Sequence, residues 1–546
     1  MSTVSEVVAG VVAEYVTDVF ALMGNGNAYF TDALARQQKV RTTGLRHEAG
    51  TVASADAYYR VSRNMAVATT TFGPGYTNTV TPLAEAVQSR TPMVFVVGDQ
   101  PTTGARPWDI DQTGIAENVG AVTMIVNQIN PGQQTVDAFQ TAWQQRVPVV
   151  LFIPHDIGPE PAQPEPDLVV KPLPPVDSTT PDVTEALGLL STAKRPLILA
   201  GRGAREASGV LGKLADRLGA LTVATAPARG IFSGRPFDLG VCGGFASESS
   251  SALIRSADVV LVVGAGLNQF TTAFGTQFHD ETVLIQVDLA EAQTHPRVNV
   301  FYQADATDVV TALLTELANH PVPATPWNGQ AEHARESQLN FDRDTGTGQA
   351  EDGRLDPRTA MHRLNTILPT NRQVVSDGGH FIGWSSYYLD LPASDSLTLV
   401  GTQYQAIGLG LPSAVGAARG RPDTTVVVAT GDGGGVMGLP DLHALVHTAA
   451  SAVVLVFNDA CYGAEIHQYG SQGLDEQIME IEQIDFATVA QGFGAQGVVI
   501  NTVNDLDQVQ QWVRDGAHGT LVVDMRISRN VVAPYIQEII ELTIKR

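Results

Sequence analysis

With 546 residues, the chain is too long for a single hydrophobic core, and three domains are the natural division. A composition of 44% hydrophobic and 16% charged residues, with 52 glycines, is typical of well-packed α/β enzymes and excludes a disordered or fibrous chain. The formal net charge of −24 argues against a nucleic-acid partner, because an acidic surface repels phosphate groups.

The two cysteines, Cys242 and Cys461, are too few for a disulfide framework and lack the spacing of a metal site. No apolar run approaches the ~18 residues that a membrane-spanning helix needs, and the first residues carry no basic leader pattern. We therefore expect no membrane partner and a cytoplasmic location.

The first unit, which we predict over residues 1–160, alternates strands and helices. An amphipathic helix pattern runs from 4 to 22 and leads into the loop Met23–Asn27. The elements that follow are an Ala-rich helix over 51–59, a strand over 66–71, a helix ending near Ala86, and strands over 93–97 and 148–154. This alternation, with glycine turns between the elements, predicts a doubly wound parallel sheet.

Two further units of the same kind follow. A proline-rich linker over 159–181 precedes a second domain at 181–325, and a polar linker over 322–356 precedes a third domain at 356–546. Their apolar strands include 259–263, 283–288 and 373–376. The predicted fold class is therefore α/β, with three doubly wound parallel-sheet domains, of which the first and third read as two versions of one plan.

The chemistry concentrates in the stretch from Val426 to His467. A buried strand over 426–430 leads into the turn Gly431–Gly435 and a helix, and a second buried strand over 453–457 ends at Asn458-Asp459. Such a turn suits an anion, and Asp432 within it suits a hard cation that bridges protein and phosphate. Asn458 and Asp459 add two oxygen-bearing side chains, so a diphosphate held through Mg²⁺ explains both turns.

The spacing of these turns resembles the GDG…NN signature of thiamine diphosphate enzymes, although a GDG alone is commonly just a turn. The second Asn of the family pair is Asp459 here, and a carboxylate can bind a metal in the same way. The resemblance implies thiamine diphosphate and Mg²⁺, with the metal on Asp432, Asp459 and the backbone carbonyl of Cys461.

The three-part order resembles the branch of this family that contains pyruvate oxidase and acetolactate synthase. That branch has a pyrimidine-binding (PYR) domain, a central domain and a diphosphate-binding (PP) domain, in this order. Its cofactor lies between the first domain of one subunit and the third domain of another. The resemblance therefore implies a homo-oligomer, either a homodimer or a homotetramer.

Glu48 is the predicted catalytic carboxyl group. In Arg46-His47-Glu48 it matches the family motif whose Glu contacts the aminopyrimidine ring and relays a proton to and from the coenzyme. Taken alone, a Glu before an Ala-rich helix is more often a charge at a helix start. The loop over 72–78, Phe-Gly-Pro-Gly-Tyr-Thr-Asn, resembles a second motif of the family and favours the catalytic role.

The resemblance also implies a set of residues that bind the cofactor. Ile407 occupies the position of the apolar wedge that bends the coenzyme, although it also fits an ordinary core residue, and the carbonyl of Gln405 would face the aminopyrimidine. The diphosphate would be bound by Gly378, Gly379, His380, Gly431, Gly433 and Gly434.

Four residues are candidates for the substrate side. Asn25 stands where 2-keto acid decarboxylases have an Asp, and Glu465 stands where they have a catalytic Glu. His467 follows two residues later, so on a helix it points to another face than Glu465; a solvated pair explains both equally well. Gln112 lies near the region that contributes a Gln in acetolactate synthases, although the local sequence departs from that pattern.

The sequence thus predicts a Mg²⁺- and thiamine diphosphate-dependent, acetolactate synthase-like enzyme. It would act on a 2-oxo acid or a diketone as a lyase or transferase, in the manner of a decarboxylase or carboligase. One alternative is a flavin-linked oxidoreductase of the pyruvate oxidase type. We do not expect FAD, however, because the Gly turns at 201–203 and 264–266 are not GxGxxG fingerprints. The other alternative is a non-catalytic paralogue, which the intact Glu48 and metal ligands disfavour.

Overall fold

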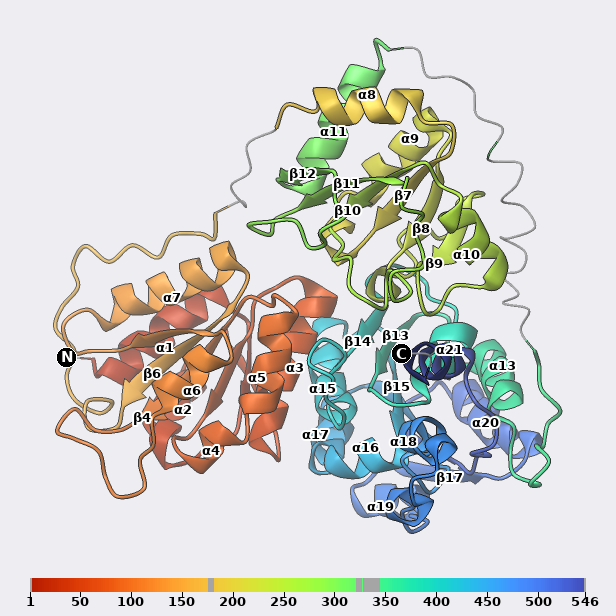
Figure 1. Ribbon diagram of the computed structural model, residues 1–546. Coiled ribbons are helices and arrows are strands. Elements are labelled where there is room, and N and C mark those ends of the chain that lie inside the picture. Colours follow the sequence, from red (N-terminus) through yellow and green to blue (C-terminus); the bar gives the residue numbers. More distant parts are fainter. Residues whose placement is uncertain (1, 175–180, 321–326, 328–343, 545–546) are drawn as a thin grey trace.

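The structure is a computed structural model that describes residues 2–174, 181–320, 327 and 344–544. It has three lobes, each built on a six-stranded sheet whose neighbouring strands are all parallel, with helices packed around each sheet (Figure 1). The predicted fold class is confirmed. The exact domain boundaries stay predictions, and most of the polar linker lies outside the described residues.

The first sheet has the strand order β2-β1-β3-β4-β6-β5. Its strands are β1 (Asp18–Ala21), β2 (Arg41–Gly44), β3 (Val67–Thr70), β4 (Met93–Asp99), β5 (Val122–Ile125) and β6 (Pro148–Pro154). Its helices are α1 (Val4–Tyr15), α2 (Ala28–Ala35), α3 (Glu48–Ser62), α4 (Pro74–Thr77), α5 (Val80–Gln88), α6 (Gln112–Asn118) and α7 (Pro131–Gln145). The central strands β3, β4 and β6 are buried along their whole length, as their apolar sequences predict.

The prediction of a single helix over 4–22 was wrong. Helix α1 ends at Tyr15, because Val16 is extended (φ −131°), and β1 follows within three residues. β1 pairs with β2 on one side and β3 on the other, so its four residues are buried by the sheet. The apolar residues of a fully buried strand continue the pattern of the helix, and periodicity alone does not separate the two.

The central sheet has the order β12-β11-β10-β7-β8-β9, the strand order of dinucleotide-binding doubly wound folds. Its strands are β7 (Pro196–Ala200), β8 (Leu221–Ala224), β9 (Asp238–Val241), β10 (Val259–Val263), β11 (Val283–Asp288) and β12 (Val300–Gln303). Its helices are α8 (Thr184–Thr192), α9 (Ser208–Leu218), α10 (Glu248–Arg255) and α11 (Ala306–Leu317).

The third sheet has the order β14-β13-β15-β16-β18-β17, which repeats the order of the first sheet strand for strand. Its strands are β13 (Arg372–Ser376), β14 (Leu397–Leu399), β15 (Thr425–Gly431), β16 (Ser451–Phe457), β17 (Gln496–Ile500) and β18 (Gly519–Met525). Its helices are α13 (Pro357–Ile367), α14 (Ile382–Tyr388), α15 (Gly410–Gly420), α16 (Asp432–Met437), α17 (Pro440–Thr448), α18 (Gly463–Gln468), α19 (Phe486–Gly492), α20 (Asp507–Arg514) and α21 (Pro534–Ile544). The expectation that the first and third units share one plan is confirmed.

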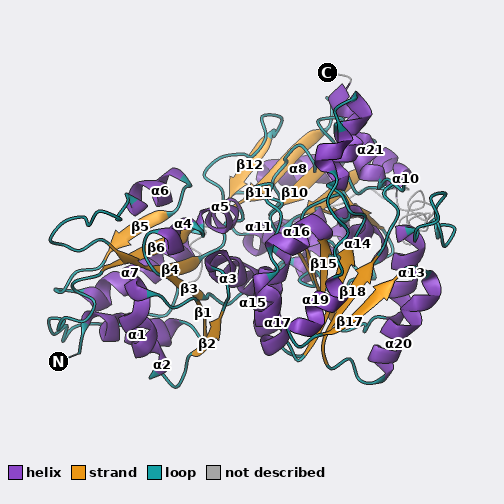
Figure 2. Ribbon diagram, turned by 90° about the horizontal axis from the view of Figure 1, so that it is seen from below, coloured by secondary structure: helices purple, strands orange, loops and turns teal. Residues whose placement is uncertain are grey.

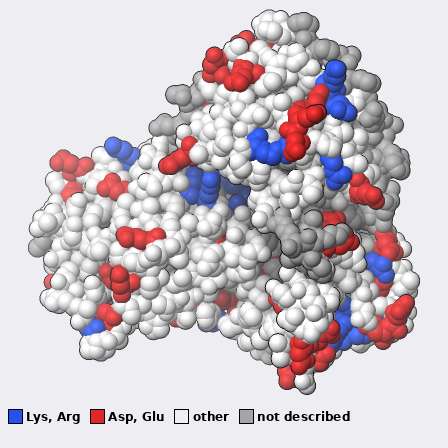
Figure 3. Space-filling model, in the orientation of Figure 1, with Lys and Arg blue, Asp and Glu red and all other residues white. Residues whose placement is uncertain are grey.

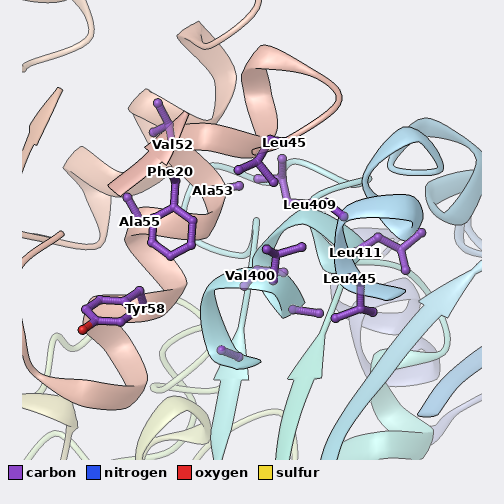
Figure 4. Packing of buried hydrophobic residues seen from close by; sticks show 14 of the residues in the cluster. Phe20, Leu45, Val52, Ala53, Ala55, Tyr58, Val400, Leu409, Leu411 and Leu445 are labelled. Atoms are coloured by element: carbon purple, nitrogen blue, oxygen red, sulfur yellow. The ribbon is translucent and has the colours of Figure 1, made fainter. Parts of the chain in front are cut away.

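The first and third units share a hydrophobic core at α3 and α15, which lie side by side (Figures 1 and 2). Figure 4 shows Leu45 and Ala53 of the first unit on the side of the core towards Leu409 and Leu411 of the third unit. The two helix backbones nearly touch, because a Cβ on Gly416 would lie 1.9 Å from the carbonyl oxygen of Ser54. We call this contact, together with the loops that precede α3 and α15, the seam.

The surface matches the acidic composition. On the face drawn in Figure 3, acidic and basic side chains are both scattered over all three lobes, and one group of basic side chains lies in the hollow between the first and central lobes. Within the part of the chain that the structure describes, no helix combines the length and the hydropathy that crossing a membrane requires.

The close approach at the seam gives a first prediction. Replacing Gly416 by Ala forces the backbones of α3 and α15 apart, and overpacking of this kind costs about 1–3 kcal/mol. We expect the melting temperature of Gly416→Ala to fall by several degrees. The matched control is Gly10→Ala in α1, where nothing lies within 4 Å of the added Cβ; it should leave the melting temperature unchanged or slightly raised. Equal melting temperatures for the two variants would contradict the tight seam.

Candidate functional site

Three loops meet at the carboxyl edge of the third sheet. β13, β15 and β16 are neighbours, and each ends in a polar turn: Asp377–His380, Gly431-Asp432 and Asn458–Cys461. The turns are connected by hydrogen bonds, because Asp432 accepts at one carboxylate oxygen from the Ala460 N–H (2.8 Å) and at the other from the Gly433 N–H (2.8 Å). The sequence places Asp432 in a turn, and the structure makes it the link between two turns.

Asp432 and Asp459 are two buried carboxylates, only 3% and 6% exposed. Burial, reinforced by the charge of Asp459, raises the pKa of Asp432 to about 7, and burial raises the pKa of Asp459 to about 6. Neither forms an ion pair with Lys, Arg or His in the described residues. Two buried like charges without a cation have the chemistry of a site for a hard divalent ion.

The side chains at this edge favour a metal ion that needs few protein ligands. Among the described residues, no group of three or more His, Cys, Asp or Glu side chains could enclose a metal. Burial and the neighbouring Asp459 raise the pKa of the Cys461 thiol, so this side chain stays protonated and is a poor ligand. Mg²⁺ fits such a site, because it is commonly held by one or two carboxylates together with phosphate oxygens and water.

Asn458 has a different role from the one its sequence position suggests. Its side chain is fully buried, and its amide donates to the Ile484 carbonyl (2.9 Å) and to Asp524 on β18 (2.8 Å). Its side-chain oxygen accepts from the side-chain amide of Gln483, so all polar atoms of the Asn458 side chain are engaged. A buried amide needs partners, and those partners lie inside the unit.

His380 lies on the loop after β13 and meets a second histidine. Its Nε2 accepts from the Ala533 N–H (2.8 Å), so Nδ1 carries the proton, and burial together with His467 lowers its pKa to about 3. The rings of His380 and His467 lie 4.7 Å apart, and Nε2 of His467 is buried without a partner among the described residues. The structure thus brings together two candidates that lie 87 positions apart in the sequence.

The loop before α15 holds the wedge candidate in a strained conformation. Gln405 has φ +61°, which only a surrounding structure can impose on a residue other than Gly, Asn or Asp. Ile407 lies against Gly378, because a Cβ on that glycine would be 3.3 Å from the Cγ2 atom of Ile407. Asp377, which we did not select from the sequence, accepts from the Gly408 N–H (3.0 Å) and so joins the two loops.

Glu48 is the first residue of α3, in the first unit. One of its carboxylate oxygens accepts from the side-chain amide of Asn78 (3.0 Å), and a Cβ on Gly75 would lie 3.7 Å from its Cγ atom. The two sequence motifs of the first unit therefore meet, and Asn78 is a functional candidate that the motif contained but that we did not single out. No hydrogen bond or ion pair within the described residues joins Glu48 to the three loops of the third sheet.

The remaining substrate candidates differ in their surroundings. Asn25 is exposed on the loop after β1, whose shape depends on the buried Asn27 that accepts from the Gly24 N–H (2.8 Å). Gln112 is 3% exposed and uses both ends of its amide, accepting from the Gly73 N–H (2.6 Å) and donating to the Gly98 carbonyl (3.0 Å). Gln112 therefore shapes the loop that carries Asn78.

Glu465 and His467 lie on α18 and point to different faces, as their spacing predicts. Glu465 is exposed, whereas His467 is half-buried against His380. Glu465 has no hydrogen-bond or ion-pair partner for its carboxylate within the described residues.

Comparison with known sequences identifies the three units. Residues 2–123 match the profile described as "Thiamine pyrophosphate enzyme, N-terminal TPP binding domain", residues 183–313 match the central domain of the same enzymes, and residues 377–525 match their C-terminal TPP binding domain. The chain belongs to the thiamine pyrophosphate enzyme family. The resemblance that the motifs indicate is confirmed.

Several relatives match over most of both chains. An acetolactate synthase isozyme 1 large subunit from Escherichia coli is 26% identical over 492 residues, which are 87% of this chain and 85% of the relative. A sulfoacetaldehyde acetyltransferase from Roseovarius nubinhibens is 27% identical (90% and 86%), and a pyruvate oxidase from Lactiplantibacillus plantarum is 25% identical (94% and 86%).

Among solved structures, the fold is similar to that of a thiamine diphosphate-dependent 4-hydroxybenzoylformate decarboxylase from Rhodococcus jostii RHA1. The TM-score is 0.81, and the match covers 96% of this chain and 99% of the other at 20% identity. At that identity the likeness shows the shared fold.

The buried carboxylates give a second prediction. Asp459→Asn removes one of two like charges, so the metal-free protein should melt at a higher temperature than the wild type above pH 7. The folded pKa of Asp459, about 6, lies above its ordinary value of 3.8, so the cost of ionising it is absent near pH 4, grows up to pH 6 and is complete above it. That cost is at most about 3 kcal/mol.

The measurement is the melting temperature of the wild type and of Asp459→Asn between pH 5 and 8, in the presence of a metal chelator. The advantage of the variant should shrink towards pH 5. An advantage that grew on acidification would show that Asp459 is stabilised as a carboxylate.

Proposed function

We propose that the protein is a Mg²⁺- and thiamine diphosphate-dependent enzyme that decarboxylates a 2-oxo acid, or joins or cleaves a C–C bond next to a carbonyl group. The observation that carries this proposal is the carboxyl edge of the third sheet, where Asp432 and Asp459 are buried and form no ion pair within the described residues. Membership of the family supports thiamine diphosphate as the cofactor. The pair of buried carboxylates supports a bound metal ion.

In this proposal the third unit holds the diphosphate end of the cofactor. Mg²⁺ would bind Asp432, Asp459 and the carbonyl of Cys461, because these groups stand on the two connected turns. The diphosphate would lie on the glycine turns, where side chains do not obstruct the backbone. The residues assigned to it are Gly378, Gly379, His380, Gly431, Gly433 and Gly434. In the neutral His380, the Nδ1–H remains as a donor.

Glu48, Gln405 and Ile407 would act on the pyrimidine end. When bound, thiamine diphosphate supplies a carbon nucleophile that attacks a carbonyl carbon and stabilises negative charge there. Glu48 would hold and move the proton at the pyrimidine nitrogen, with Asn78 orienting its carboxylate. Ile407 would support the bent cofactor, and the strained Gln405 would present its carbonyl group.

The substrate side is proposed from Asn25, Glu465 and His467. His467 offers an Nε2 without a partner, and Glu465 offers an exposed carboxylate, so these groups can donate or accept a proton near a bound substrate. Asn25 can only hydrogen-bond. Gln112, with both amide ends engaged inside the first unit, would act by holding the loop of Asn78. The names of the relatives, which include a synthase, an acetyltransferase and a decarboxylase, support this range of reactions.

Activity would be tested by loading the purified protein with thiamine diphosphate and Mg²⁺ and offering a panel of 2-oxo acids and 1,2-diketones. Mass spectrometry would follow CO₂ release and ligation products. We expect turnover of at least one class, and a loss of about 10²-fold or more in Glu48→Gln, because general acid–base groups contribute 10²–10⁴-fold. Equal rates in Glu48→Gln and wild type would contradict the role of Glu48, and no turnover across the panel would favour a non-catalytic paralogue.

A homo-oligomer is part of the proposal. Ile407 is 38% exposed, and Val436 and Met437 on α16 are 42% and 55% exposed, so apolar surface surrounds the proposed cofactor edge of a single chain. Glu48 also forms no hydrogen bond or ion pair with that edge within the described residues, so a second copy that brought its own Glu48 there would complete the site. Light scattering should give a mass of two or four chains, and a monomer of 57.9 kDa that turns over substrate would contradict this.

The flavin-linked alternative has one supporting observation. Arg202 and Arg205 follow β7, form no ion pair with described residues, and have pKa values lowered to about 10 and 9 by burial and by neighbouring arginines. Such charges would suit a second diphosphate. Against this, a Cβ on Gly201 would lie 2.1 Å from the Gly264 carbonyl oxygen, so the two glycine turns pack against each other. A colourless purified protein would exclude this alternative. The domain boundaries 1–160, 181–325 and 356–546 and a cytoplasmic location also stay predictions.

A further inference from the structure

Two buried carboxylates, one in the first unit and one in the third, each accept hydrogen bonds from the backbone of the other unit at the seam. Asp441 on α17, 2% exposed, belongs to the third unit but accepts from the backbone N–H of Arg46 (2.7 Å) in the first unit. The N–H of His47 is a second donor to it. Gly50 makes room for this contact, since a Cβ there would lie 2.1 Å from an Asp441 oxygen. The loop that Asp441 holds is the one that leads into Glu48.

Glu85 on α5 is the counterpart in the first unit. It is 1% exposed and accepts at one oxygen from the backbone N–H groups of Gln403 (3.0 Å) and Tyr404 (2.8 Å) in the third unit. Its other oxygen accepts from Arg60 (2.9 Å), which also pairs with Asp56 (2.7 Å). The loop that Glu85 holds leads into the strained Gln405 and the wedge Ile407.

The two contacts occupy equivalent places in the two units. In the shared strand order, β2 corresponds to β14 and β3 corresponds to β15. The loop of Glu48 follows β2 and precedes α3, and the loop of Ile407 follows β14 and precedes α15. Likewise α5 follows β3 by way of α4, and α17 follows β15 by way of α16. The helices α5 and α17 are therefore equivalent, and so are the loops before α3 and α15. A carboxylate on each of these helices binds the equivalent loop of the other unit.

We propose that Asp441 and Glu85 are reciprocal positioning residues: Asp441 fixes the loop of Glu48, and Glu85 fixes the loop of Gln405 and Ile407, each from the other unit across the seam. This inference rests on the proposed function for what the two loops do. A charged acceptor that takes two consecutive N–H groups gives stronger and more directional bonds than a neutral one. Burial excludes the water that would otherwise replace it. The strained φ of Gln405 needs such a constraint from outside its own loop.

The test uses Asp441→Asn and Glu85→Gln, which keep the shape but lose the charge and one acceptor. Glu85→Gln leaves Arg60 paired with Asp56. The matched control is Asp258→Asn, because Asp258 also accepts from two consecutive backbone N–H groups, those of Lys194 and Arg195 (both 2.8 Å), but within the central unit.

The first readout is amide hydrogen exchange of the full-length protein without cofactor. Asp441→Asn should speed exchange about tenfold at residues 46–47, and Glu85→Gln should do so at residues 403–404, each in the unit that was not mutated. Asp258→Asn should change neither segment. If exchange rose only around the mutated residue itself, or in both segments equally, the reciprocal arrangement would be overturned.

The second readout is exchange of the C2 proton of thiamine diphosphate at saturating cofactor and Mg²⁺. Asp441→Asn should slow it about tenfold or more, since small misplacements of a reacting group are costly, while the cofactor dissociation constant stays within about threefold of wild type. A rate equal to that of wild type and of Asp258→Asn would overturn the positioning role of Asp441. An absence of C2 exchange in the wild type itself would instead count against the proposed function, and the amide-exchange result would still stand.

Discussion

The burial of Asp432 and Asp459 is the constraint on which the account depends. A protein gains nothing in stability by placing two carboxylates at 3% and 6% exposure without a cation, and burial raises the pKa of both. The backbone nevertheless holds Asp432 there, through the N–H groups of Gly433 and Ala460. The cation that we propose between them would explain such an arrangement, because functional sites keep strain that the rest of the fold offsets.

The rest of the site is arranged around that edge by the seam. The first and third units are two copies of one strand order, and α3 and α15 bring them so close that only Gly416 fits opposite Ser54. The loops that precede these helices carry Glu48 and Ile407, so a close helix contact fixes the two loops to which we assign the pyrimidine end of the cofactor. The position of each loop is then set by backbone contacts, which vary less than side-chain contacts.

The sequence predicts the parts of this structure that depend on local pattern. Fully apolar strands such as 426–430 and 453–457, bounded by glycine turns, are recognisable because parallel strands are buried on both faces. The same rule explains the error at β1, where a buried strand of four residues follows α1 so closely that one apolar pattern covers both. Asn458 shows a further limit, since sequence order does not say which way a buried amide turns.

Long-range partners were beyond sequence analysis. Nothing near Asp441 in the sequence indicates that it binds the backbone of Arg46, 395 positions away, or that Glu85 binds Gln403, 318 positions away. Asp377 and Asn78 could have been selected from the sequence, because each lies inside a motif. Asp377 follows the end of a strand, and Asn78 lies in a glycine-containing loop. Individual acidic residues are common on any surface, so only the three-dimensional arrangement separates those that position a loop.

The most direct test of the central claim is a calorimetric titration of thiamine diphosphate into dialysed protein, with and without Mg²⁺. The account predicts binding that requires the metal in the wild type and is lost in Asp432→Ala, in which one of the two proposed carboxylate ligands is gone. Binding of equal strength with and without Mg²⁺, or in Asp432→Ala, would contradict a metal-held diphosphate at the carboxyl edge of the third sheet.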